Sequence, residues 1–134
     1  MTQKTLCVQT KGKGLYAITE DVLREAGPLP SVGLMNLFVR HTSASLLIQE
    51  NYDPTARKDL ETFLEKLIPE NQNWHSHTVE GPDDTTSHLK SAITAVTLTI
   101  PITDGHLALG RWQGIYLWEH RQSSHNREIV ITVS

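Results

Sequence analysis

The chain has 134 residues, a formal net charge of −3, and hydrophobic and charged fractions of 38% and 20%, as expected for one globular domain spanning residues 1–134. Without an excess of positive charge, the sequence offers no general surface for the phosphate backbone of a nucleic acid. No apolar run approaches the roughly 20 residues that span a bilayer. The N-terminal segment lacks the apolar stretch of a signal peptide, so we expect a cytoplasmic protein.

The first half of the chain predicts short strands around one small helix. Cys7, the single cysteine, excludes an internal disulfide, and its place in an alternating run predicts a half-buried strand residue. Thr19 is expected to cap a helix that stops at Gly27. The predicted strands are residues 3–9, 15–18, 32–40 and 43–49.

The clearest helix signal follows the last of these strands. Asp53 can cap a helix, Pro54 suits the first helical position, and apolar residues recur at helical spacing until Pro69. Residues 70–86 form a long polar loop, a feature that is usually functional in a compact domain. A short helix is expected from Ser87 to about Ile93.

The second half of the chain predicts mainly strands. Thr103-Asp104-Gly105 is typical of a hairpin turn. Consecutive strands with single inserted helices indicate an α+β fold, in which two or three helices cover one face of a largely antiparallel or mixed sheet. The predicted strands are residues 94–102, 107–118 and 127–133.

Seven histidines are a high count for a chain of this length. His75 and His77 would point to the same side of an extended segment. His88 lies just beyond the polar loop, and His41 lies between two apolar strands. Neutral imidazole is the commonest transition-metal ligand, but isolated histidines also serve as hydrogen-bonded structural residues. From spacing alone, both interpretations stay open.

Two acidic segments offer further polar candidates. Glu50, Asn51 and Asp53 follow a predicted buried strand, where they could hold a metal, a water or a pyrophosphate-bound cation. For Asp53, helix capping is the first interpretation, whereas capping does not need Glu50. Asp84 lies in an acidic loop between His77 and His88, which places it beside the same candidate site.

The segment Gly110-Arg111-Trp112-Gln113-Gly114 is unusual for a strand. Its two glycines suggest a bulge or a close backbone approach. Trp112 could be a core residue, or it could stack on an aromatic heterocycle while Gln113 forms hydrogen bonds.

Three segments resemble successive blocks of the YjbQ-like family. They are HTSASLLIQENYDPTARKDLETFL, EGPDDTTSHLKSAI and IPITDGHLALGRWQGIYLWEHR. QKTL near the start and REIVIT near the end extend the resemblance over the whole chain. The family commonly has threonine before the Trp-Gln pair, where this chain has Arg111.

The resemblance implies a compact α+β protein that assembles as a homotrimer with polar pockets near the subunit boundaries. It also implies that His41, His77 and His88 converge as ligands of a divalent metal. Zinc, nickel or iron(II) suits histidine ligands, and magnesium suits pyrophosphate. His75, His106, His120 and His125 are expected at the surface. The matching polar and aromatic positions are Glu50, Asn51, Asp53, Asp84, Trp112 and Gln113.

The family is described as one of secondary thiamine-phosphate synthases, which join a pyrimidine-methyl diphosphate to a thiazole phosphate and release pyrophosphate. The resemblance implies such a transferase here, with a small phosphorylated metabolite as partner and with neither nucleic acid nor membrane. Trp112 would stack on the pyrimidine, and Arg111 would help to neutralise phosphate. The candidate catalytic residues are Glu50, Asp84 and Gln113, and the other candidate substrate-binding residues are Asn51, Asp53, Lys90 and Arg127.

Two other functions fit the same residues. A metal-dependent hydrolase would use a histidine-bound metal to activate water, with Glu50 or Asp84 as base. A non-enzymatic trimer would bind a metal or a phosphorylated metabolite without turnover. Histidine ligands favour zinc, nickel or iron(II), whereas pyrophosphate departure usually employs magnesium, so the synthase activity can be secondary to another use of the site.

Overall fold

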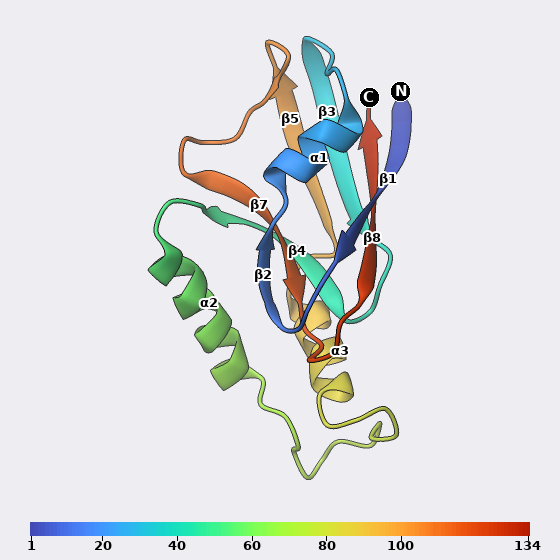
Figure 1. Ribbon diagram of the computed structural model, residues 1–134, viewed down its shortest axis with the longest axis vertical. Coiled ribbons are helices and arrows are strands. Elements are labelled where there is room, and N and C mark those ends of the chain that lie inside the picture. The colour runs from blue at the N-terminus through green and yellow to red at the C-terminus, as the bar shows by residue number, and fades with distance from the viewer.

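The computed structural model describes all residues 1–134 and has two antiparallel sheets and three helices. In chain order the elements are β1 (Thr2–Gln9), β2 (Gly14–Ala17), α1 (Thr19–Ala26), β3 (Val32–Val39), β4 (Ala44–Glu50), α2 (Pro54–Leu67), α3 (Asp84–Ile93), β5 (Thr97–Thr103), β6 (His106–Leu107), β7 (Gln113–Glu119) and β8 (Asn126–Val133). The predicted α+β class is therefore confirmed, and Figure 1 shows the arrangement.

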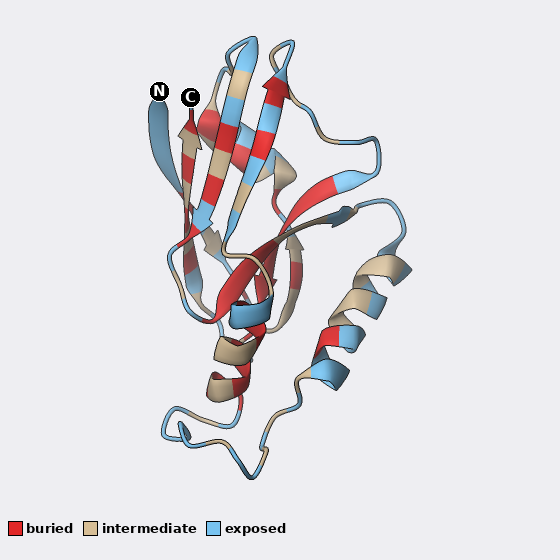
Figure 2. Cartoon of the chain, turned by 180° about the vertical axis from the view of Figure 1, so that it is seen from behind, coloured by how far each residue is buried: buried red, intermediate tan, exposed pale blue.

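The strands divide between a larger and a smaller sheet. The larger has the order β1-β8-β3-β5-β6 and the smaller the order β2-β7-β4. Apolar side chains from the two sheets and from α1 form one core. A second apolar cluster joins Leu15, Tyr116 and Trp118 of the smaller sheet to Leu64 of α2. Buried residues therefore follow β7 along both of its faces (Figure 2).

From the sequence we expected the helices to cover one face of the sheet, but in the structure they lie on different surfaces. α1 packs against β1, β8 and β7, α3 packs against β4, and α2 packs against β2 at the side of the molecule. The reason is that each sheet has an apolar surface to cover, and one helical layer cannot reach both. None of the three helices is both long enough and apolar enough to cross a lipid bilayer.

Several local predictions are confirmed by backbone geometry. Asp53 caps α2, since its Oδ1 accepts a hydrogen bond of 2.9 Å from the backbone N–H of Thr55. Gly27 ends α1 with a φ of 73°. Asp104 and Gly105 connect β5 to β6 in a two-residue hairpin turn. Their φ values of 51° and 79° are both positive, as a type I′ turn requires.

Other local predictions are wrong. Thr19 does not cap α1, because its Oγ1 accepts a hydrogen bond from the backbone N–H of Ile115 instead. The predicted strand 107–118 is two strands, β6 and β7, with residues 108–112 between them. α3 begins at Asp84 rather than Ser87. Cys7 is exposed rather than half-buried, because it lies on the uncovered face of β1.

A buried ion pair joins the two sheets. Arg127 of β8 donates from Nε to Oε1 of Glu119 of β7 at 2.7 Å, and a second hydrogen bond runs from its Nη2 to Oε2. Burial alone would raise the pKa of Glu119, but hydrogen bonds from Arg127 and Thr10 hold this pKa below its ordinary value. Both side chains are almost fully buried, since the side chain of Glu119 is 0% exposed and that of Arg127 is 3% exposed. Each charge is therefore stable in the core only while the other is present.

His120 corrects another expectation, because it is buried rather than at the surface. The side chain leaves the end of β7 on the face opposite Glu119, where its Nε2 lies 2.9 Å from Oγ of Ser45. Burial, followed by the positive charges of Lys90, Arg127 and Lys13, lowers the pKa of His120 to about 3. The ring is therefore neutral in the folded protein at ordinary pH.

We predict that Arg127→Met lowers the free energy of unfolding by about 3–5 kcal/mol, because it leaves the Glu119 carboxylate buried and unpaired. Adding Glu119→Leu should restore most of the loss. Urea denaturation measures both variants. Arg24→Met, which removes an exposed pair with Asp21, is the control and should cost less than about 1 kcal/mol. A cost as small for Arg127→Met would contradict this role of the ion pair.

The buried His120 predicts a loss of stability in acid. Its folded pKa of about 3 lies below the unfolded value of 6.5, so protonation favours the unfolded chain, and stability falls as pH drops below 6.5. Between pH 7.5 and pH 5, protonation of His120 in the unfolded chain should lower the free energy of unfolding by about 2 kcal/mol. His120→Gln cannot titrate, and urea denaturation at both pH values should show a correspondingly smaller loss. The exposed His106→Gln serves as control, and equal pH dependence in all three proteins would refute the prediction.

Candidate functional site

Four side chains at the start of α3 and in the preceding loop form a group that could hold a metal ion. The ligand atoms of His77, Glu80, Asp84 and His88 all lie within 4.8 Å of one another. Oδ2 of Asp84 lies 2.7 Å from Nε2 of His77 and 3.1 Å from Nε2 of His88. Asp84 and His88 are four residues apart on α3, so both project from the same face of the helix. Two imidazoles and two carboxylates are a donor set that zinc, nickel and iron(II) accept.

The ring of His88 is oriented by the backbone. Its Nδ1 lies 2.9 Å from the carbonyl oxygen of Thr42, and because a carbonyl only accepts, Nδ1 must carry the proton. The neutral ring therefore has its lone pair on Nε2, and this atom faces the Asp84 carboxylate. A lone pair facing a carboxylate requires a shared cation, either a proton or a metal ion.

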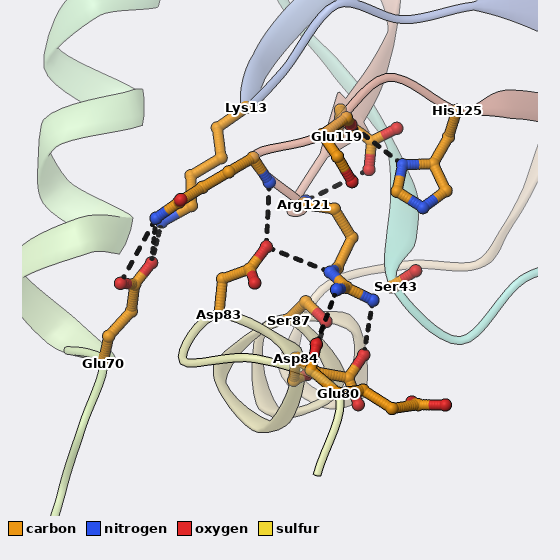
Figure 3. A network of polar contacts seen from close by, with 12 residues as sticks. Lys13, Ser43, Glu70, Glu80, Asp83, Asp84, Ser87, Glu119, Arg121 and His125 are labelled. Atoms are coloured by element: carbon orange, nitrogen blue, oxygen red, sulfur yellow. Dashed lines mark hydrogen bonds and ion pairs between the residues drawn. The ribbon is translucent and has the colours of Figure 1, made fainter. Parts of the chain in front are cut away.

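Asp84 is held in place from its other side by Arg121, as Figure 3 shows. Arg121 donates from Nη1 to Oδ1 of Asp84 at 2.6 Å and from Nε to Oδ2 of Asp83 at 3.0 Å. Burial alone would raise the pKa of Asp84, but its hydrogen bond with His77, the neighbouring Glu80 side chain, and the charges of His88 and Arg121 lower this pKa below its ordinary value. The carboxylate is thus anionic and has one oxygen free for the histidines.

The histidines open onto a cavity of about 1330 Å³ between α3 and the ends of β3 and β4. His41, His77 and His88 all line this cavity, but His41 lies outside the four-residue group. Its Nε2 accepts a hydrogen bond of 2.8 Å from the backbone N–H of Glu128. Burial, together with the charge of Arg127, lowers the pKa of His41. His41 therefore faces the cavity as a neutral ring whose Nε2 is already engaged.

A second polar group lies at the opposite end of β4. Asn51 is outside the histidine cavity, since its backbone N–H donates to the carbonyl of Trp112 at 2.9 Å and its Nδ2 donates to the carbonyl of Gln113. Glu50 pairs with Gln113 in the β4–β7 ladder. A methyl group on Gly114 would lie 2.8 Å from Cβ of Asn51. This close approach explains the glycine that follows Gln113.

The exposed Trp112 forms an aromatic surface at this end. Its ring meets that of Tyr52 edge to face at 5.0 Å, and the guanidinium of Arg111 lies 4.8 Å from the ring centre. β4 has seven residues from Ala44 to Glu50, so the aromatic surface and the histidine cavity are separated by roughly 20 Å along this strand. Within one chain, the structure does not bring Glu50, Trp112 and the histidines together.

The predicted phosphate-binding cations also lie elsewhere than expected. Lys90 is two residues from His88 on α3 and so projects from the opposite face, where it is buried and pairs with Glu65. Arg127 does line the histidine cavity, but its guanidinium is occupied by Glu119 and Ser43. Asp53 caps α2 near the aromatic surface. Neither Lys90 nor Arg127 is free to contact phosphate beside the histidines.

Two contributors to the group were missed from the sequence. Glu80 is one acidic residue among several in the loop before α3, and Arg121 lies between the predicted strands 107–118 and 127–133. The spacing of Asp84 and His88 did carry a signal, because four residues is one helical turn, but placing the start of the helix at Ser87 hid it. Arg121 had no local signal, since its partners lie more than thirty residues away.

The chain is similar to known proteins over nearly its whole length. The family model described as UPF0047 protein YjbQ-like matches residues 4–134. A UPF0047 protein from Synechocystis sp. is 45% identical, with 98% of this chain and 90% of that protein covered. UPF0047 protein YjbQ from Escherichia coli O157:H7 is 41% identical, with 98% and 96% covered. The crystal structure of a conserved hypothetical protein from Thermus thermophilus matches with a TM-score of 0.86 and 37% identity, covering 98% of this chain and 99% of that one.

Proposed function

The chain belongs to the YjbQ-like family of UPF0047 proteins, and from that premise we propose that it is a metal-dependent enzyme acting on small phosphorylated metabolites. The proposed reaction is that of a secondary thiamine-phosphate synthase. A pyrimidine-methyl diphosphate joins a thiazole phosphate, the new bond forms at the pyrimidine methylene carbon, and pyrophosphate leaves. The proposed setting is the cytoplasm, without nucleic acid or membrane as partner.

The orientation of His88 carries this proposal. A histidine that binds a metal commonly donates its other ring N–H to a backbone carbonyl or carboxylate, and Nδ1 of His88 meets the carbonyl of Thr42 in this way. Nε2 then faces Asp84 and His77. The proposed ion is zinc, nickel or iron(II), with magnesium accompanying the pyrophosphate. When bound, the ion supplies a Lewis acid that offsets the charge of the departing group.

The rest of the cavity supports binding of a phosphorylated substrate. Arg40 lies on the cavity wall with 57% of its side chain exposed, and its pair with Glu128 is long, at 3.6 Å. Its guanidinium can therefore turn toward phosphate at little cost. His41 presents a neutral ring beside it. Arg121 keeps Asp84 anionic and fixes this carboxylate beside the histidines.

We further propose that the protein is a homotrimer in which the Trp112 surface of one subunit completes the histidine cavity of the next. The need for this follows from the separation of the two groups along β4. An exposed apolar strip on β3, formed by Val32, Leu34 and Phe38, offers a contact surface, and Phe38 also lines the cavity. A subunit seated on this strip would border the cavity and exclude water from it.

Hydrolysis is the second candidate, and the separation of the groups favours it for an isolated chain. His77, Asp84 and His88 lie beside Glu80, whose side chain is 62% exposed and whose Oε2 lies 3.7 Å from Nε2 of His77. Such a carboxylate can accept a proton from water that attacks a phosphate ester. Pyrophosphate release that requires both substrates identifies the synthase, whereas phosphate release from a single ester identifies the hydrolase.

We predict that untagged protein contains about one transition metal ion per chain, as a site with two histidines and carboxylates should, and that His77→Ala/His88→Ala loses it. Mass spectrometry of metals measures the content, and pyrophosphate release from the paired substrates should be lost in parallel. His106→Ala/His125→Ala removes two histidines outside the group and should keep both properties. Absence of metal from the wild type, even after incubation with zinc or nickel, would refute the metal site.

A site shared between subunits predicts complementation. Trp112→Ala and His88→Ala should each abolish synthase turnover as pure proteins. Refolding the two together at equal amounts should restore about a quarter of wild-type activity, because a quarter of the contacts in random trimers join an intact histidine group to an intact Trp112. Two preparations of His88→Ala mixed in the same way serve as control. No recovery in the mixture would place the whole reaction within one chain.

A further inference from the structure

The second face of α3 carries a polar cavity that the proposed function does not use. Lys90 leaves α3 on the side away from His88, and its side chain is only 1% exposed. Its Nζ makes one polar contact, with Oε1 of Glu65 on α2. A lysine so deeply buried needs an anionic partner to remain charged. Here the partner comes from a side chain that is itself 45% exposed.

Glu65 bridges two ammonium groups. Its Oε1 accepts from Lys90, and its Oε2 lies 3.4 Å from Nζ of Lys13, which also pairs with Glu70. Burial alone would raise the pKa of Glu65, but the hydrogen bonds and charges of Lys90 and Lys13 lower it. A carboxylate held between two ammonium groups occupies the position that the oxygens of a bound phosphate would take.

His120 adds a third donor to the same place. Ser45 is fully buried, and its Oγ makes no other contact, so its proton is placed best when it is donated to Nε2 of His120. The neutral ring then carries its own proton on Nδ1, which has no partner in the chain. Lys13, Lys90 and His120 all line one cavity of about 460 Å³ between α2, α3 and the smaller sheet.

We propose that this cavity is a phosphate-binding site formed by Lys13, Lys90 and His120, in which Glu65 occupies the anion position until phosphate or a phosphate monoester displaces it. Lys90 and Lys13 supply two ammonium groups to the phosphate, although Lys13 also keeps its pair with Glu70, and an uncharged N–H supplies a further hydrogen bond. Glu65 lies on the exposed part of α2, so its side chain can swing to solvent when the anion enters. The site is separate from the histidine cavity, because Lys90 and His88 project from opposite faces of α3.

The test is calorimetric titration of the full chain with inorganic phosphate at neutral pH. Glu65→Gln removes the competing carboxylate and should tighten binding by about tenfold or more, the change expected from loss of one charge-assisted contact. Lys90→Met should abolish binding and should fold, since it removes a buried charge whose partner is half-exposed. Lys13→Met provides an independent second loss, from a side chain that is 23% exposed. Asp59→Asn removes an exposed carboxylate of α2 that does not line the cavity, and it should leave binding unchanged.

The histidine site is separated from this one by a further variant. His77→Ala/His88→Ala should bind phosphate as the wild type does, so that failure of the proposed enzymatic function leaves this result untouched. Binding that is lost in that variant but kept in Lys90→Met would assign the phosphate to the histidine cavity and overturn the proposal. The absence of binding up to millimolar phosphate in both the wild type and Glu65→Gln would overturn it as well.

Discussion

The buried ion pair between Glu119 and Arg127 is the contact on which the histidine cavity and the cavity between α2 and α3 both depend, because it fixes the end of β7 in the smaller sheet to β8 in the larger sheet. From that fixed point three consecutive side chains diverge. Glu119 points into the core, His120 points to the opposite face toward Ser45, and Arg121 reaches the start of α3. The strand alternation that sends Glu119 and His120 to opposite faces thereby connects three features to one short segment: the two sheets, one wall of the cavity between α2 and α3, and the histidine–carboxylate group at the start of α3.

The orientation of α3 determines which of its side chains face each of the two cavities. Its first turn is anchored by Arg121 through Asp83 and Asp84, so the helix cannot rotate without breaking two ion pairs. With that rotation fixed, residues four apart share one face, and Asp84 stands beside His88. Lys90, two residues further on, is turned inward toward α2. One helix of ten residues thus separates a group that could hold a metal from a cavity lined by three lysines and three glutamates.

Local chemistry in the sequence predicted much of the fold and less of the site. The Asp53-Pro54 cap, the glycine that ends α1 and the Asp104-Gly105 turn depend on neighbouring residues, and so they could be identified without tertiary information. The burial of His120 and the partners of Arg121 could not, since both arise from contacts far apart in the sequence. The group at His77 and His88 was anticipated, but the approach of Glu80 depends on how the loop before α3 folds.

β4 sets the distance between the two polar ends of the smaller sheet. The histidine cavity lies at the start of this strand, beside His41, whereas the polar residues Glu50 and Asn51 lie at its other end. An extended strand is stiff, so no side-chain motion within one chain can bring Trp112 to His88 over roughly 20 Å. In the trimer proposed above, a reaction that needs both ends would draw them from different subunits, with the neighbour seated on the apolar strip on β3 that leads to Phe38. A reaction that needs only the metal group would leave the exposed aromatic surface without a catalytic use. For this reason the assembly of the protein and the identity of its reaction are one question.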